Sequence, residues 1–416
     1  MVNAIFSMSP FLRHFAGQFA SVFSSRLRET FLRYLAALFL EFHRFSLQAA
    51  CLKVPLGSYQ SLQYFLSEAK WDPDELNAQR LRLIQSSHHR RSVREGVLVI
   101  DDTACKKPYA FKTDAVSAQY VAGEAVPVKA NVAVFSAFAH PERKFPVALK
   151  LYVPADHFRL GTLDRQFQTK IQLAKTLVQE AITHPITFSD VVFDSWYFSE
   201  ELVSFLEHPS RDLTWITEAK GDRLISYRGD WVHADDLEKV IPRDRFKHAV
   251  TVPSASGKPR VFLTYSFLAK VKGLKGKKKI VVALGSWDPR DPRKAHVFVT
   301  NRLALAANEI LRRFALRWKI EEVFRELKDF LYFDHYQVRS RRAIVRHWHL
   351  VLLAHTHLYL HAPPPGTVSH EQKRLSPIGL ALRFQRAYND HAAFRWIRKN
   401  RTLATLFAFT QPLEAA

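Results

Sequence analysis

The sequence predicts a mixed α/β protein with a central sheet flanked by helices, a β-rich insertion that interrupts it, and a helical region in front. Apolar residues recur at helical spacing before residue 95, and β-branched runs ending in acidic residues follow. Alternating apolar and polar segments between 211 and 300 are punctuated by glycine and proline. These changes predict five parts, of which the last is a basic helical tail: 1–95, 96–210, 211–300, 301–362 and 363–416.

The charge balance points to a polyanionic partner. Lysine and arginine number 61 against 39 aspartate and glutamate, which gives a net charge of +22. Nucleic acid is the leading candidate, and a ribosome-associated or membrane-surface protein is the alternative. The chain has only two cysteines, which fits a reducing cytoplasm. The apolar run from 31 to 52 is interrupted by charge, so we expect a buried helix and no membrane span, and we expect no secretory signal.

The first 95 residues are predicted to be mostly helical. One helix should open at Asp72, because a proline follows at its first helical position. Arginine and histidine residues gather between 80 and 94. This basic stretch suits phosphate contacts, and a solvated basic face is the alternative.

The segment VLVIDDT (97–103) predicts a buried strand that ends in Asp101 and Asp102. Carboxylates there are costly unless a cation or hydrogen bonds compensate them. A metal site is therefore one interpretation, and aspartates that cap their own turn are the other. Because successive strand residues face opposite sides, only one of the two should face a metal. We favour Asp101, with Asp102 as the alternative.

Further strands are predicted at 131–138 and 147–153, then a helix at 164–183 and a strand at 187–194 that ends in Asp194. Two strand ends that carry carboxylates, with a helix between them, give the arrangement of a ribonuclease-H-like core. A site made of carboxylates without Cys or His suits the hard, oxygen-preferring Mg²⁺ ion.

The interval 211–300 is predicted to be a β-strand insertion into this core. Its segment KVKGLKGKKK (270–279) is rich in lysine and includes Lys277 and Lys278. We predict a hairpin tip over phosphates, with a solvated turn as the alternative. Trp287 lies near a strand end, where a tryptophan usually belongs to the core.

The segment FALRWKIEEVFRELK (314–328) predicts a helix with one functional face. At roughly 100° per residue, Phe314, Arg317, Glu321 and Lys328 lie within about 60° of one another. The spacing resembles the signature helix of cut-and-paste DDE transposases from bacterial insertion sequences. That family usually has tyrosine at the first position, so Phe314 keeps the ring and lacks the hydroxyl.

The resemblance implies a catalytic and metal-binding triad of Asp101, Asp194 and Glu321. Two divalent cations, Mg²⁺ or Mn²⁺ in its place, are then expected. Arg317 and Lys328 would hold DNA phosphates, and Trp287 would be the counterpart of an aromatic that holds a flipped base.

The resemblance further implies cleavage at terminal inverted repeats and strand transfer into target DNA by a homodimer in the bacterial cytoplasm, at the nucleoid, without a membrane partner. A metal-dependent nuclease without strand transfer, or a non-catalytic DNA-binding derivative, remains the alternative.

The region 334–361 predicts a long apolar helix that closes the core. Arg339, in front of it, is a predicted DNA contact. The helix carries several histidines, but no cysteine or carboxylate joins them at ligand spacing, so a zinc site is not expected. The motif PPPGT (363–367) predicts a linker.

Overall fold

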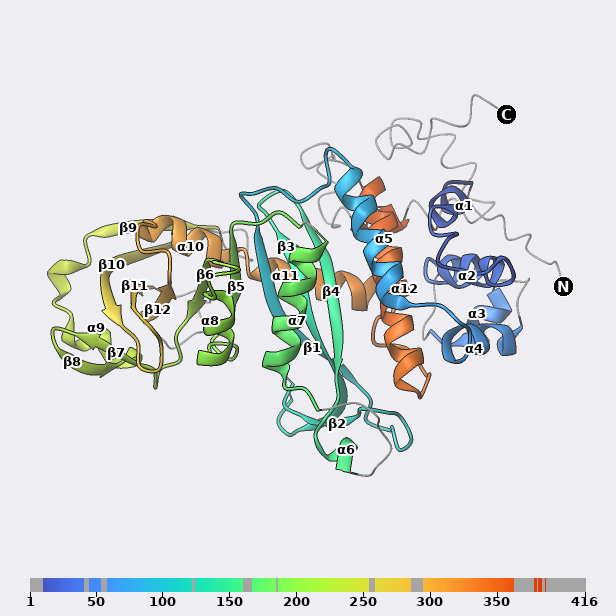
Figure 1. The fold of residues 1–416 in the computed structure, drawn as a ribbon, viewed down its shortest axis with the longest axis horizontal. Helices are drawn as coiled ribbons and strands as arrows, with labels where there is room; N and C mark the ends of the chain where they lie inside the picture. The colour runs from blue at the N-terminus through green and yellow to red at the C-terminus, as the bar shows by residue number, and fades with distance from the viewer. Residues whose placement is uncertain are drawn as a thin grey trace. The chain divides into compact units, whose positions relative to one another are not determined.

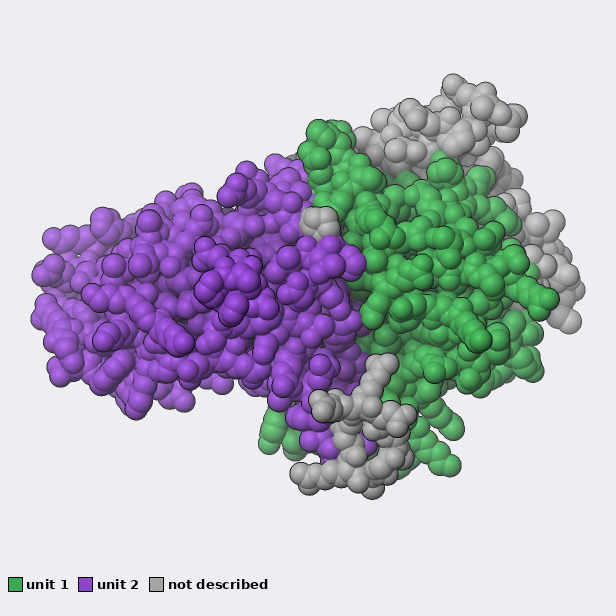
Figure 2. Space-filling model, viewed as in Figure 1, with its two compact units in different colours: residues 1–91, 104–132, 323–416 green, residues 92–103, 133–322 purple. Residues whose placement is uncertain are grey.

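The computed structural model describes residues 10–40, 45–53, 58–121, 124–159, 167–184, 186–253, 259–285 and 295–362, with 378, 379, 381–383 and 386. Trp287, the predicted linker and most of the predicted tail lie outside these residues. The chain divides into two compact units (Figure 2). Unit 1 contains 1–91, 104–132 and 323–416, and unit 2 contains 92–103 and 133–322. These units cut across the five predicted parts, which remain a proposal.

Unit 1 is built around the long helix α12. Its helices are α1 (Pro10–Gly17), α2 (Ser25–Ala37), α3 (Leu47–Lys53), α4 (Tyr59–Ser67), α5 (Pro73–Ser86) and α12 (Arg341–His361). α12 packs against α2, α4 and α5 and lies beside α5 in Figure 1. The predicted start of α5 is confirmed, since Asp72 accepts the Asp74 N–H and Pro73 follows it.

A buried arginine ties α12 to the connection between α4 and α5. The Arg346 guanidinium donates to the carbonyl oxygens of Leu66, Ala69 and Trp71 at 3.1, 2.7 and 2.6 Å. It also lies 4.6 Å from the centre of the Trp71 ring. A charged donor from another helix therefore satisfies one carbonyl in the last turn of α4 and two in the connection that follows it.

The described strands form a ten-stranded sheet and a two-stranded one. The core strands are β1 (Val97–Lys106), β3 (Val128–Ala139), β4 (Lys144–Tyr152), β5 (Asp190–Phe193) and β6 (Trp215–Glu218). They lie in the order β4-β3-β1-β5-β6, with β2 (Ser117–Gln119) also on β3. β5 runs parallel to both β1 and β6. This order, with the first strand in the centre, is the predicted ribonuclease-H-like arrangement, and the predicted fold class is confirmed.

Helices cover this core, as the fold class requires. α7 (Lys170–Thr183) packs on β4 and α8 (Glu200–Leu206) packs on α7 (Figure 1). A capping box starts α7, because Thr169 accepts the Gln172 N–H and the Gln172 side chain accepts the Thr169 N–H. The short helix α6 (Asp156–Arg159) precedes α7.

The insertion extends the core sheet through further strands. β12 (Ala295–Thr300) pairs antiparallel with β6, and β11 (Lys277–Leu284), β10 (Arg260–Lys270) and β9 (His248–Val252) follow in antiparallel order. β7 (Leu224–Tyr227) and β8 (Asp230–His233) form the separate hairpin, and α9 (Leu237–Val240) follows. Alternation predicted the strands, but the pairing of β12 with β6 has no local signal.

The predicted continuous helix 314–328 is wrong. α10 (Ala307–Ala315) ends before Arg317, and α11 (Trp318–Arg325) follows and runs into a π-helical turn, Glu326–Phe330. Between α10 and α11 the N–H of Arg317 bonds to the oxygen of Phe314 and that of Ile320 to Arg317, in the tighter i to i−3 pattern. Because the helix is interrupted at this point, the projection of 314–328 as one continuous helix does not give the directions of its side chains.

No helix among the described residues is long and apolar enough to cross a membrane.

Candidate active site

Register brings two aspartates side by side where the pairing of β1 with β5 ends, although β1 itself continues to Lys106. Val97 pairs with Asp190 and Ile100 with Phe193 in the parallel ladder. The next residues along the two strands are Asp101 and Asp194. Parallel strands end at the same edge of a sheet, so these two side chains arrive together.

Asp101 is largely buried and lies close to other carboxylates. Its Oδ1 accepts the Asp102 N–H at 2.8 Å, and its Oδ2 accepts from Arg317 Nη1 at 3.2 Å. Burial raises the pKa of Asp101 to about 7, against the lowering effect of Arg317, and repulsion from Asp194 and Glu321 adds to the rise. The three predicted catalytic carboxylates are therefore near enough to influence one another.

Asp194 is held by the turn that follows β5. Its Oδ1 accepts the N–H groups of Trp196 and Tyr197 at 3.0 and 3.3 Å. Burial raises its pKa, and the Arg317 charge opposes that rise. The motif SWYF after Asp194 thus orients the carboxylate through the backbone.

Asp102 faces a different set of partners. Its Oδ2 pairs with Lys170 Nζ at 2.9 Å, and its Oδ1 accepts from the Tyr197 hydroxyl at 3.0 Å. Burial, followed by the charge of Asp102, raises the pKa of Tyr197 well above its usual value. Sequence reasoning missed Lys170 and Tyr197, although Lys170 opens a helix and Tyr197 follows a strand-end aspartate by three residues.

Glu321 and Glu322 are adjacent in α11 but differ in their contacts. Glu322 Oε2 pairs with Lys144 at 2.6 Å and with Lys319 at 3.4 Å. Glu321 is half-buried and has no hydrogen bond or ion pair within the described residues. The charge of Glu321 acts on Asp101. Of the two adjacent glutamates, Glu322 is paired with lysines, whereas Glu321, at the position of the family's signature glutamate, has no ion pair within the described residues.

Arg317 lies among the carboxylates and does not extend into solvent. Its guanidinium is 5.7 Å from the centre of the Phe314 ring and 5.5 Å from that of Trp318. Its Nε is buried and has no hydrogen-bond partner within the described residues. In this structure Arg317 therefore supplies the positive charge that the aspartates need.

The chemistry of the three carboxylates fits a hard divalent cation, since every donor is oxygen. Their placement is not yet that of a metal site: across the described ranges, no group of three or more His, Cys, Asp or Glu lies close enough together to hold a metal ion. The ion pair between Arg317 and Asp101 occupies one donor oxygen.

Several predicted DNA contacts require correction. Phe314 is buried and packs on Phe298 with ring centres 4.9 Å apart, so it belongs to the core. Lys278 is 3% exposed and pairs with Glu207 at 2.8 Å, so it is not available to phosphates. A buried ammonium group without a partner would be unfavourable, and the ion pair with Glu207 compensates for that cost.

Other predicted contacts keep their surface position. Lys277 and Arg339 are exposed. Lys328, in unit 1, donates to the Ala104 oxygen at 2.9 Å. Except for His361, the histidines of α12 are buried: the His347 ring bonds to the Tyr34 hydroxyl at 2.7 Å, and burial lowers its pKa to about 3.

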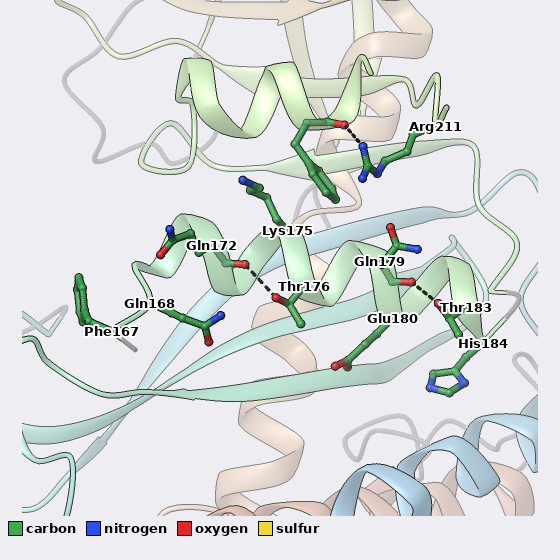
Figure 3. A pocket seen from close by; sticks show the side chains of 11 residues that line it. Phe167, Gln168, Gln172, Lys175, Thr176, Gln179, Glu180, Thr183, His184 and Arg211 are labelled. Carbon is green, nitrogen blue, oxygen red and sulfur yellow. Dashed lines mark hydrogen bonds between the residues drawn. The ribbon is translucent and has the colours of Figure 1, made fainter. Parts of the chain in front are cut away.

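An open groove of about 800 Å³ lies along α7 and beside α8 (Figure 3). The groove lining combines glutamine and threonine side chains with charged and aromatic ones, among them Lys175, Arg211 and Phe205. None of the predicted catalytic residues lines it.

Comparison with protein families gives two overlapping matches. A family described as DDE superfamily endonuclease matches residues 18–235, and a family described as transposase DDE domain matches residues 168–356. Both matches include Asp194, the first includes Asp101 and the second includes Glu321. No curated protein matches the chain.

Proposed function

Because the chain belongs to the DDE superfamily of endonucleases and is a DDE transposase, we propose that it binds terminal inverted repeats, cuts phosphodiester bonds and joins transposon 3′ ends to target DNA. The observation that supports this most is the register of β1 and β5, which brings Asp101 beside Asp194. The charge of Glu321 acts on the same carboxylate. All three carboxylates belong to unit 2, and their mutual electrostatic influence supports the proposal that they act together.

The proposed ligands of the divalent ions are Asp101, Asp194 and Glu321. The family generally uses divalent metal ions, and an all-oxygen donor set favours Mg²⁺, with Mn²⁺ as a substitute. When bound, two such ions activate the attacking oxygen and stabilise the leaving oxygen of the phosphodiester. We assign Asp101 and not Asp102 as the ligand, because the charges of both Asp194 and Glu321 act on Asp101, whereas Asp102 is paired with Lys170 and Tyr197.

Arg317 has a defined role in this scheme. It neutralises Asp101 in the metal-free protein, since its guanidinium donates to Oδ2. A cation held by Asp101 would compete with Arg317 for Oδ2, and the guanidinium would then be a positively charged donor for a DNA phosphate. Arg317 thereby keeps the phosphate contact that the sequence assigned to it.

The DNA-binding surface follows from charge. The net charge of +22 suits a polyanion, and exposed Lys277 and Arg339 are proposed phosphate contacts. Lys328 can contact phosphate only in competition with the Ala104 carbonyl. The helical region 1–95 is proposed to bind the transposon ends. Trp287 is proposed to stack on a flipped base. The proposed active form is a homodimer at the bacterial nucleoid.

A second candidate is a metal-dependent DNA nuclease without strand transfer, which the endonuclease description of the first family favours. Incubation of the protein with a pre-cut transposon end, a supercoiled plasmid and Mg²⁺ separates the two. A transposase joins the end to the plasmid, whereas a nuclease releases fragments and forms no joined product. Absence of both products would refute both functions.

A further inference from the structure

Three aromatic side chains of unit 1 are almost fully exposed. Tyr109, Phe111 and Tyr120 are each 87% exposed, in the stretch of chain that connects β1 to β3. Tryptophan, phenylalanine and tyrosine usually bury most of their area, because exposing it to water is unfavourable. Exposed aromatic residues that lie close together mark a contact surface. We call these three residues the aromatic patch.

The β2–β3 ladder places members of the patch on one face. Ala118 of β2 is paired with Lys129 of β3, so their side chains lie on the same side of the ribbon. Tyr120 directly follows the end of β2 at Gln119 and is therefore close along the chain to the Ala118–Lys129 pair. Lys129 Nζ lies 4.7 Å from the centre of the Phe111 ring, which brings Phe111 to the same face.

The backbone that carries the patch is anchored within unit 1. Lys107 Nζ donates to the oxygens of Asp334 and Tyr336 at 2.6 and 2.8 Å. The Asp114 N–H bonds to the Arg339 oxygen at 2.9 Å, and Asn131 Nδ2 donates to the Asp114 oxygen at 2.8 Å. The rings are therefore presented by a fixed backbone, which lowers the entropy that a ligand must overcome.

The charge around the patch selects its partner. Lys112 and Lys129 are exposed beside the rings, and the acidic Asp114 is engaged with the backbone N–H of Arg341 at 3.0 Å. Flat rings interleaved with cations match a nucleic acid whose base faces are accessible. Bases inside a duplex are already stacked and cannot stack on these rings, so the complementary ligand has unpaired bases.

We propose that the aromatic patch binds unpaired bases of DNA by stacking, with Lys112 and Lys129 on the adjacent phosphates. This inference rests on the proposed DNA-processing function and specifies the form of DNA that the protein prefers. The patch contains none of the proposed catalytic carboxylates, so its loss should change substrate preference and leave the catalytic residues in place.

The test compares two fluorescent DNA probes, a fully paired duplex and the same duplex with a short single-stranded overhang containing 2-aminopurine. The full-length wild type should bind the overhang probe more tightly and quench its 2-aminopurine. The triple variant Tyr109→Ala, Phe111→Ala, Tyr120→Ala should bind the overhang probe about tenfold more weakly and the paired probe as the wild type does.

Two control variants distinguish an effect of stacking from an effect of charge and from the mere exposure of an aromatic ring. Trp231, on β8, is 50% exposed, and Trp231→Ala should change binding to neither probe. Lys112→Ala should weaken binding of the overhang probe and lower its salt dependence by about one phosphate contact, while the bound 2-aminopurine stays quenched. Unchanged melting temperatures show that the variants fold, as expected for exposed side chains.

Each contrary result has a distinct meaning. Equal binding of both probes by the wild type, or unchanged overhang binding by the triple variant, overturns the inference and leaves the proposed function intact. A change from dimer to monomer in the triple variant without a change in probe preference also overturns it, because the patch would then be a protein interface. Failure of the wild type to bind any DNA overturns the proposed function together with the inference.

Discussion

The carboxylate of Asp101 should destabilise the metal-free protein at neutral pH, and Asp101→Asn should relieve this. Its pKa rises from 3.8 to about 7 on folding. At about 1.4 kcal/mol per pH unit, keeping it charged in the folded state costs at most about 4 kcal/mol. A folded-state pKa above the unfolded one means that the folded protein binds the proton more tightly. Stability is therefore lost as pH rises from about 4 through 7.

Urea unfolding in EDTA, followed by tryptophan fluorescence, measures this directly. Asp101→Asn should raise the free energy of unfolding by up to about 4 kcal/mol at pH 8 and by about 1 to 2 kcal/mol at pH 5. Asp102→Asn is the matched control with the opposite sign. It breaks the bonds to Lys170 and Tyr197 and should lower stability by about 1 to 2 kcal/mol.

Two results would refute this reasoning. One is an Asp101→Asn protein that is no more stable than wild type at pH 8. The other is a gain in stability that does not depend on pH, because the expected gain comes from removing the Asp101 carboxylate, whose pKa is about 7. Equal effects of the two asparagine substitutions would mean that the two aspartates share one environment.

Three further predictions concern residues around the site and on the insertion. Tyr197→Phe removes a hydroxyl that donates to a carboxylate and should slow DNA cleavage while filter-binding affinity stays unchanged; an equal loss of both would point to misfolding. Arg313→Ala leaves Asp190 buried without one of its two cations and should cost about 3 to 5 kcal/mol in thermal unfolding, so a loss below 1 kcal/mol would contradict it. Lys277→Ala should weaken DNA binding and lower its salt dependence, whereas Lys278→Ala should lower the melting temperature and leave the salt dependence unchanged.

The order of the core strands along the chain could be predicted, because each strand is indicated by residues that are neighbours in the sequence. VLVIDDT predicts a strand that contains Asp101, and β1 contains it, but the predicted end at the aspartates is wrong because β1 continues to Lys106. The strand ending near Asp194 is β5. Alternating residues likewise predicted the strands of the insertion. These features depend on residues that are neighbours in the chain.

The details of the site could not be predicted because they depend on distant partners. Which aspartate faces the other carboxylates is set by Lys170 and Tyr197, far along the chain. The burial of Phe314 follows from its packing on Phe298, which a helical projection does not contain. The ion pair of Lys278 could not be predicted, because the lysine-rich sequence does not show which lysine pairs with Glu207.

The break between α10 and α11 is the third such feature. The pattern at 314–328 is helical throughout, and neither glycine nor proline marks an interruption. The i to i−3 hydrogen bonds at Arg317 place its guanidinium on Asp101. Tertiary ion pairing thus overrides a local preference for continuous helix.

The central claim, that Asp101, Asp194 and Glu321 form the catalytic carboxylates, is tested most directly by comparing Glu321→Gln with Glu322→Gln. The two substitutions remove the same charge at adjacent positions of α11, but only Glu322 is paired with lysines. Cleavage of supercoiled DNA in Mg²⁺ should vanish in Glu321→Gln, with DNA binding retained, and persist in Glu322→Gln. Cleavage by Glu321→Gln at the wild-type rate, or its loss in Glu322→Gln alone, would contradict the account.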